Sequence, residues 1–208
     1  MYTTIALTSA LAALSAAAPA PVASAAPKDL FHLKTVPHNP ARTAFSQYLT
    51  SFHVGAGQST IVGTKDASKA SSFFIDVAAG HYLHEDTGRT DIPTFDVGLK
   101  KQAPYQSNAP AGYNYISLDL GAAGTADATN GWVKIPNPDG KGEVVVYSGP
   151  SPFENNPEVK SFALCHVNGT SPYPTLGPQY QFLWEAPTTK PQYANCADVT
   201  LQAVPVKK

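Results

Sequence analysis

Residues 113–120 read YNYISLDL, and this stretch decides the class of the fold. Ile116, Leu118 and Leu120 fall on one face of an extended chain. The other face carries Tyr113, Tyr115, Ser117 and Asp119. Alternation with a period of two is the pattern of a half-buried strand. We therefore predict a strand here, and the same pattern can be followed along the chain on both sides of it.

Short apolar or alternating stretches recur from Leu30 to the end of the chain, separated by clusters of Gly, Pro, Asn, Asp and Ser. The expected strands are 31–35, 44–54, 60–63, 73–77, 81–84, 94–99, 113–120, 131–135, 143–147, 161–167, 179–185 and 199–206. The stretch 44–54 also fits a broken helix, and Asp66 is expected to cap a single helical turn. No convincing amphipathic helix is present in the sequence. The pattern predicts an all-β, single compact domain of about a dozen short strands, with a barrel or β-trefoil-like architecture and a β-sandwich as the alternative. No threefold repeat is visible in the sequence.

The first 27 residues are interpreted as a secretion signal followed by a leader. The apolar run from Ile5 to Ala18 is shorter than the roughly 20 residues needed to span a bilayer. Small residues at Ser15 and Ala17 favour cleavage before Ala18, although no Lys or Arg precedes the run. We predict a signal peptide over residues 1–17, an Ala/Pro-rich leader over 18–28 and a β-domain over 29–208. The predicted location is extracellular or in the cell wall, with no membrane anchor, and the alternative is an exposed disordered head.

Charge and cysteine content narrow the classes of partner. The formal net charge is −1, and basic residues form no cluster larger than a pair, which argues against nucleic-acid binding. The two cysteines, Cys165 and Cys196, predict one disulfide in an exported protein, with buried free thiols as the alternative. The sequence Asn168-Gly169-Thr170 is an N-glycosylation sequon, so Asn168 is a predicted glycan site.

The sequence contains no recognised catalytic or metal-binding motif. His81 and His84 are three residues apart in an expected strand, where their imidazoles should point to opposite faces, and no metal or cofactor is predicted. There is no serine nucleophile elbow and no phosphate-binding loop. A glycosidase needs two neighbouring carboxylates, and sequence alone brings no two together. The carboxylates in or beside expected strands are Asp76, Asp96, Asp119 and Glu185.

Aromatic side chains are the remaining candidates for recognition. Tyr180, Phe182 and Trp184 share one face of an expected strand, and Trp132 opens another. Such a row can stack on sugar rings or form the centre of an interface. The alternative, which we favour, is that the row fills the core beside the cysteines.

The sequence also resembles a family of small secreted proteins of filamentous fungi that is classed as a domain of unknown function. The stretches that carry the resemblance are 31–35, 53–57, 70–76, 164–166, 179–184 and 196–204. They cover the two ends of the domain, while the region from about residue 89 to 158 matches poorly. The resemblance implies a fungal source, export, a Cys165–Cys196 bridge and an all-β domain, and it supplies no catalytic residue.

These observations lead to a functional hypothesis. The leading expectation is a non-enzymatic secreted protein that acts at the cell wall or outside the cell by binding a polymer, such as a cell-wall polysaccharide, or a host protein. A secreted carbohydrate-active enzyme with an unrecognised carboxylate pair is the first alternative. A virulence-associated effector or elicitor is the second.

Overall fold

The computed structural model is all-β and describes residues 28–55, 58–89, 94–100, 113–120, 129–149, 159, 161–167, 178–185 and 194–207. Twelve strands belong to one continuous sheet. They are β1 (Phe31–Pro37), β2 (Tyr48–Gly55), β3 (Gln58–Thr64), β4 (Ser72–Asp76), β5 (Tyr82–Asp86), β6 (Thr94–Lys100), β7 (Tyr113–Leu120), β8 (Trp132–Pro136), β9 (Glu143–Tyr147), β10 (Ser161–Val167), β11 (Gln179–Glu185) and β12 (Cys196–Pro205). Two short 3-10 helices, η1 (Thr43–Phe45) and η2 (Ala67–Lys69), lie between strands.

Six of the strands close into a ring. Antiparallel pairing runs β1–β4–β5–β8–β9–β12 and returns to β1, where Phe31 lies opposite Pro205. Two links in this ring are narrow, because β1 meets β4 through the pair Phe31–Phe73 and β5 meets the start of β8 through the bridge Tyr82–Asn130. The ring is therefore an irregular barrel rather than a uniform cylinder.

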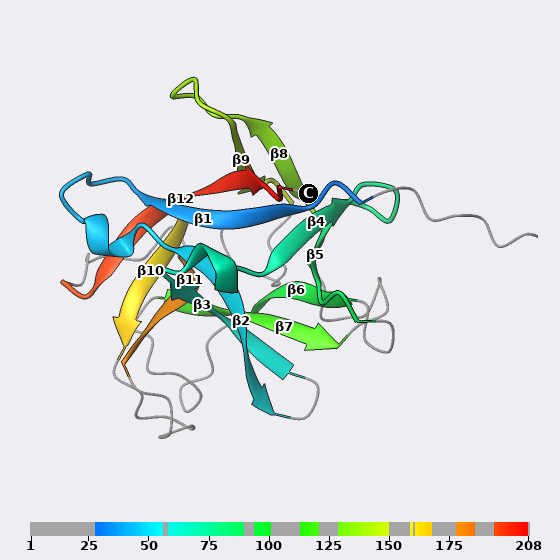
Figure 1. The fold of residues 1–208 in the computed structure, drawn as a ribbon, viewed down its shortest axis with the longest axis horizontal. Helices are drawn as coiled ribbons and strands as arrows, with labels where there is room; N and C mark the ends of the chain where they lie inside the picture. The colour runs from blue at the N-terminus through cyan, green and yellow to red at the C-terminus, as the bar shows by residue number, and fades with distance from the viewer. Residues whose placement is uncertain are drawn as a thin grey trace, which may run out of the picture.

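The other six strands form three hairpins that lie together on one side of the ring (Figure 1). The inner strands of these hairpins, β3, β7 and β11, each pair with the other two. Each unit of four strands thus gives two strands to the ring and one hairpin to the triplet, which is the β-trefoil arrangement. The predicted β-trefoil-like class is confirmed, and the single sheet differs from the two packed sheets of the alternative sandwich.

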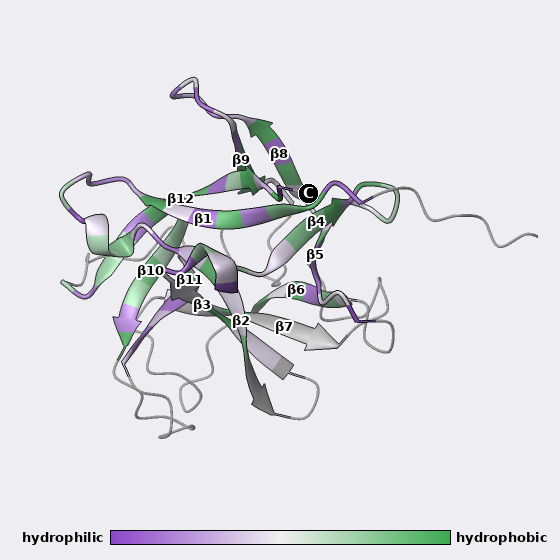
Figure 2. Cartoon of the chain, viewed as in Figure 1, coloured by the Kyte–Doolittle hydropathy of each residue, from purple (hydrophilic) through white to green (hydrophobic). Residues whose placement is uncertain are grey.

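Alternating burial explains why these segments form strands around a core. In β1 the side chains of Phe31, Leu33 and Thr35 are buried, while those between them are partly exposed. The hydropathy along β1 also changes in bands (Figure 2). Aromatic side chains extend the core from the ring of strands into the hairpins. The ring centroids of Trp132 and Phe162 are 5.5 Å apart in a stacked arrangement. This pattern supplies the apolar burial that stabilises the domain.

In the first two units, the residue just before the strand that follows the hairpin makes the same pair of hydrogen bonds to the hairpin. Before β4, the Ser71 backbone N–H donates to the Leu49 carbonyl, and its hydroxyl accepts from the Ser51 N–H at 3.0 Å. Before β8, Thr129 repeats both contacts. Its N–H donates to the Val97 carbonyl and its hydroxyl accepts from the Leu99 N–H at 2.9 Å. We call the two hydrogen bonds to hydroxyl groups, Ser51 N–H to Ser71 and Leu99 N–H to Thr129, the hydroxyl braces.

Local predictions from the sequence can now be compared with the structure. The stretch 44–54, predicted as a strand or a broken helix, is divided into the end of η1 and most of β2. Asp66 caps η2 as expected, because its side chain accepts from the Ser68 N–H at 3.0 Å. The predicted signal peptide (1–17), the leader up to residue 27 and the predicted glycan site at Asn168 lie outside the described residues.

Candidate functional site

The predicted aromatic row lies in the core. Trp132 is 0% exposed, and Phe182 and Trp184 are each 1% exposed. Tyr180 is partly exposed, but its ring packs edge-on against Phe45 at 5.4 Å. A ligand could stack on the three buried rings only if the core opened. The row therefore serves packing, and the hypothesis that it forms a binding platform is replaced by the alternative that it fills the interior.

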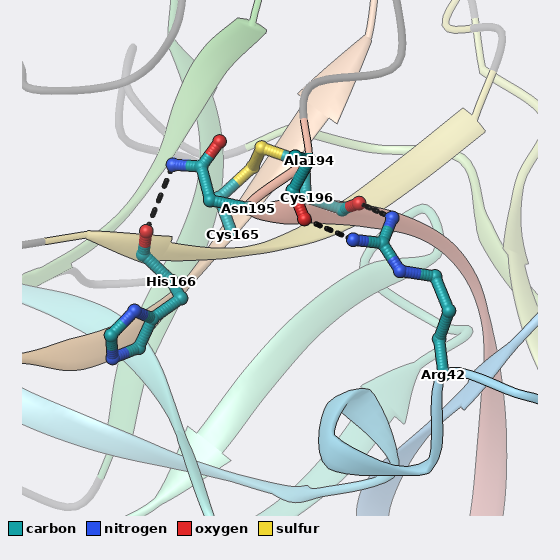
Figure 3. Close-up of a disulfide and its surroundings, with 6 residues drawn as sticks. All are labelled: Arg42, Cys165, His166, Ala194, Asn195 and Cys196. Carbon is teal, nitrogen blue, oxygen red and sulfur yellow. Dashed lines mark hydrogen bonds between the residues drawn. A yellow bond between two sulfur atoms is a disulfide. The ribbon is translucent and has the colours of Figure 1, made fainter.

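The two cysteines form a disulfide at the third hairpin junction (Figure 3). Cys165 on β10 lies directly opposite Cys196 on β12, with a Cα–Cα distance of 4.0 Å. Arg42 donates to the carbonyls of Ala194 and Cys196, as Figure 3 shows, and so ties the residue just before η1 to the start of β12. The predicted disulfide is confirmed, and both cysteines are buried.

A histidine and an aspartate form a buried pair on β5 and β6. His84 Nδ1 lies 2.7 Å from Asp96 Oδ1, and both side chains are at most 2% exposed. The imidazole stacks on Phe74 with ring centroids 5.0 Å apart. His84 Nε2 has no hydrogen-bond partner among the described residues. The pair resembles the carboxylate–imidazole half of many active sites, yet burial keeps it from substrate in this structure.

Two glutamates are also buried, namely Glu85, which follows His84 on β5, and Glu185 on β11. Burial raises the pKa of the Glu85 carboxyl, and hydrogen bonds from the Ser71 and Ser51 hydroxyls oppose that rise. Burial likewise raises the pKa of Glu185. The Ser161 hydroxyl, which donates to Glu185 Oε2 at 3.0 Å, opposes this rise, and the neighbouring Asp198 charge adds to it. Neither glutamate is more than 5% exposed. Both carboxyls are thus held where their ionisation costs free energy.

Of the carboxylates considered from the sequence, the structure places two on neighbouring strands and the others at separate points of the sheet. Asp76 Oδ1 accepts from the Ala79 N–H at 2.9 Å and fixes the turn between β4 and β5. Asp96 and Asp119 are cross-strand neighbours on β6 and β7. Glu185 lies on β11, which pairs with the opposite end of β7 at Tyr113. Asp96 and Glu185 are buried and Asp76 fixes a turn, so these three carboxylates are not placed as the open acid and base of a glycosidase.

The buried glutamates predict that stability depends on pH. Because both folded pKa values lie above the ordinary value of 4.5, their favourable contribution is complete below about pH 4.5 and is lost as the pH rises through the folded values. Glu85→Gln removes one ionisation, so its urea midpoint should fall less than that of the parent between about pH 4.5 and about pH 7.5.

The control for this prediction is Asp66→Asn. Asp66 is exposed, and hydrogen bonds from Ser68 lower its pKa, so its effect on the pH dependence has the opposite sign. Equal pH dependence in the parent and in Glu85→Gln would contradict the assignment of Glu85 as a buried, ionising group.

The outer face of β1, β2 and β12 carries the most distinctive surface group that the sequence did not reveal. Lys34 lies opposite Tyr48 in one direction and opposite Gln202 in the other. The Lys34 Nζ atom lies 5.4 Å from the centroid of the Tyr48 ring, and His32 meets the same ring edge-on at 6.3 Å. All four side chains are partly exposed. We call these four residues, His32, Lys34, Tyr48 and Gln202, the β1 surface group.

The described residues contain no group of three or more His, Cys, Asp or Glu side chains placed to hold a metal ion. In the same part of the chain, no helix is long and apolar enough to cross a membrane. The comparison with family models matches residues 28–205 to the family described as Domain of unknown function (DUF7907). Neither the comparison with curated proteins nor that with solved structures gives a match.

Proposed function

From the premise that this chain belongs to the DUF7907 family, which itself has no defined function, we propose that it is a non-enzymatic extracellular protein that binds a polymer. The observation that carries the proposal is the β1 surface group, where an aromatic ring, a cation and hydrogen-bonding side chains are partly exposed on neighbouring strands. Aromatic rings flanked by polar groups are the usual anchors of protein recognition surfaces.

The disulfide supports an extracellular location. Structural disulfides persist in oxidising compartments and are rare in the reducing cytosol. The bridge between Cys165 and Cys196 is buried in the sheet, as expected of a structural link. A fungal source, secretion through residues 1–17 and a role at the cell wall form part of the same proposal.

The first alternative is a carbohydrate-active enzyme with an unrecognised carboxylate pair. Glu185, with Asp198 nearby, is a carboxylate whose surroundings suit a general acid, because burial raises its pKa above the ordinary value and so favours the protonated form. Glu185 is only 3% exposed, however, so a polymer chain could not reach it without displacing the residues that cover it. Binding at the β1 surface group requires no such movement.

Polymer pull-down with matched variants tests the proposal. Tyr48→Ala should weaken binding to the bound polymer about tenfold or more, because the ring at the centre of a binding site is worth at least about 1.4 kcal/mol. Val36→Ala is the control, since Val36 is 41% exposed on the same face of β1 and is not part of the group. The assay uses the processed, oxidised protein and insoluble cell-wall polysaccharides.

Two results would contradict the proposal. Absence of binding to every polymer would remove its basis and return attention to protein partners. Equal binding by the parent and by Tyr48→Ala, with both correctly folded, would show that the β1 surface group is not the site.

A further inference from the structure

Lys34 differs from other well-placed cations of the domain in what it contacts. Lys134 lies 3.3 Å from the Glu143 carboxylate and also contacts Asp29, and Arg42 donates to two backbone carbonyls. Lys34 has no carboxylate within ion-pair distance among the described residues, and its recorded contact is with the face of the Tyr48 ring. Lys34 is partly exposed, so its ammonium can meet an anion from outside the domain while it stays in contact with the Tyr48 ring.

Three polar or aromatic side chains lie beside Lys34 and could contact a ligand bound to its ammonium. His32 Nδ1 lies 2.9 Å from the Ser71 carbonyl oxygen, which can only accept, so Nδ1 carries the proton and Nε2 remains for another partner. Tyr48, Lys34 and Gln202 occupy three neighbouring strands in one cross-strand row. At the usual strand spacing this row is about 10 Å long. An elongated ligand lying across the strands would meet a ring, a cation and an amide in succession.

We propose that the β1 surface group binds an acidic polysaccharide, with a uronate carboxylate on the Lys34 ammonium and adjacent sugar hydroxyls on Gln202 and His32. This inference rests on the proposed polymer-binding function and names the class of polymer. A carboxylate fixed to a sugar ring matches both the charge of Lys34 and the length of the row. The Tyr48 ring holds the ammonium in place and covers one side of it.

The charges around the group are consistent with an anionic ligand. Asp198 lies on the same face of β12, but it is four residues from Gln202, which corresponds to about 13 Å along a strand. Asp66, beyond the end of β3, is 4.0 Å from the Lys69 ammonium. The described side chains of the group itself include a cation and an imidazole but no carboxylate. Lys34 is therefore the one permanent charge within the β1 surface group, and its sign suits an anionic ligand.

The test measures binding of the oxidised protein to polygalacturonate, to the same polymer with its carboxylates methyl-esterified, and to a neutral glucan. Lys34→Gln keeps the length of the side chain and removes its charge. Lys65→Gln makes the same change of net charge at an exposed lysine outside the group. We expect Lys34→Gln to weaken binding to polygalacturonate about tenfold or more, Lys65→Gln to change it less than about twofold, and methyl esterification to reproduce the effect of Lys34→Gln.

The remaining outcomes separate this inference from the proposed function. Binding to neutral glucan or to the esterified polymer as strong as to polygalacturonate would overturn the acidic-polysaccharide inference and leave polymer binding intact. Equal losses in Lys34→Gln and Lys65→Gln would reduce the effect to general charge and overturn the specific site. Equally tight binding to polyglutamate would identify a polyanion site of another class. No binding to any polymer would overturn both proposals.

Discussion

Replacing Trp132 with alanine is expected to lower the free energy of unfolding by about 3–5 kcal/mol. The indole is fully buried and stacks on Phe162, and it also meets the Tyr147 ring at 5.4 Å. It stands at the start of β8, where the ring of strands is closed by the single bridge Tyr82–Asn130. A cavity at this link removes packing at a place where few backbone hydrogen bonds can compensate. Urea unfolding of the parent and the variant measures the difference.

The control for Trp132→Ala lies three residues further along the same strand. Ile135 is 38% exposed, so Ile135→Ala should cost less than about 1 kcal/mol. A Trp132→Ala protein that unfolded at the parental urea concentration but no longer bound polymer would contradict the assignment of this ring to the core. It would restore the idea that Trp132 contacts a ligand.

The double substitution of Cys165 and Cys196 by alanine is expected to cost about 3–4 kcal/mol, because the bridge closes a long loop in the unfolded chain. The two cysteines are separated by 31 residues in sequence. Direct pairing on β10 and β12 also means that the link secures the third hairpin to the ring. Denaturant midpoints of the oxidised parent and of the double variant measure the loss.

The hydroxyl braces provide a matched comparison for the disulfide. Thr129→Ala removes the acceptor for the Leu99 N–H at the equivalent junction of the second unit and should cost about 1–3 kcal/mol. If the double cysteine variant lost no more stability than Thr129→Ala, the covalent link would be acting as a local brace, and the loop-closure explanation would be wrong.

The strands could be predicted from the sequence because alternation is a local property. YNYISLDL at 113–120 became β7 with the expected bounds, and the 161–167 and 179–185 strands also agree. The β-trefoil-like class was among the predicted architectures, but the threefold repeat behind it is not visible in the sequence, because equivalent positions hold different residues. Ser71 and Thr129 each place a hydroxyl at their junction. At the third junction, Asn195 instead exchanges hydrogen bonds with His166 beside the disulfide. Local patterns define strands, but pairing between units depends on contacts far apart in the chain.

The candidate site shows the same limit. Period-two patterning placed Tyr180, Phe182 and Trp184 on one face, yet it could not show that this face points into the core. The β1 surface group needs η1 to return the chain so that Tyr48 lies beside Lys34, fourteen positions earlier. Only the single register pair Lys34–Tyr48 creates the group. The closeness of two side chains that depends on a turn and on strand register cannot be read from the pattern of residues along the chain.

The ladder between β1 and β12 has a consequence for protein engineering. Because Phe31 lies opposite Pro205, the beginning of β1 and the end of β12 lie side by side. A short linker could join them, and new termini could then be opened in the exposed turn between β8 and β9, where Asp139 and Gly140 lie. The point at which the chain begins can thus be moved without changing how the three units are arranged in space. We expect circularly permuted versions of this domain to fold.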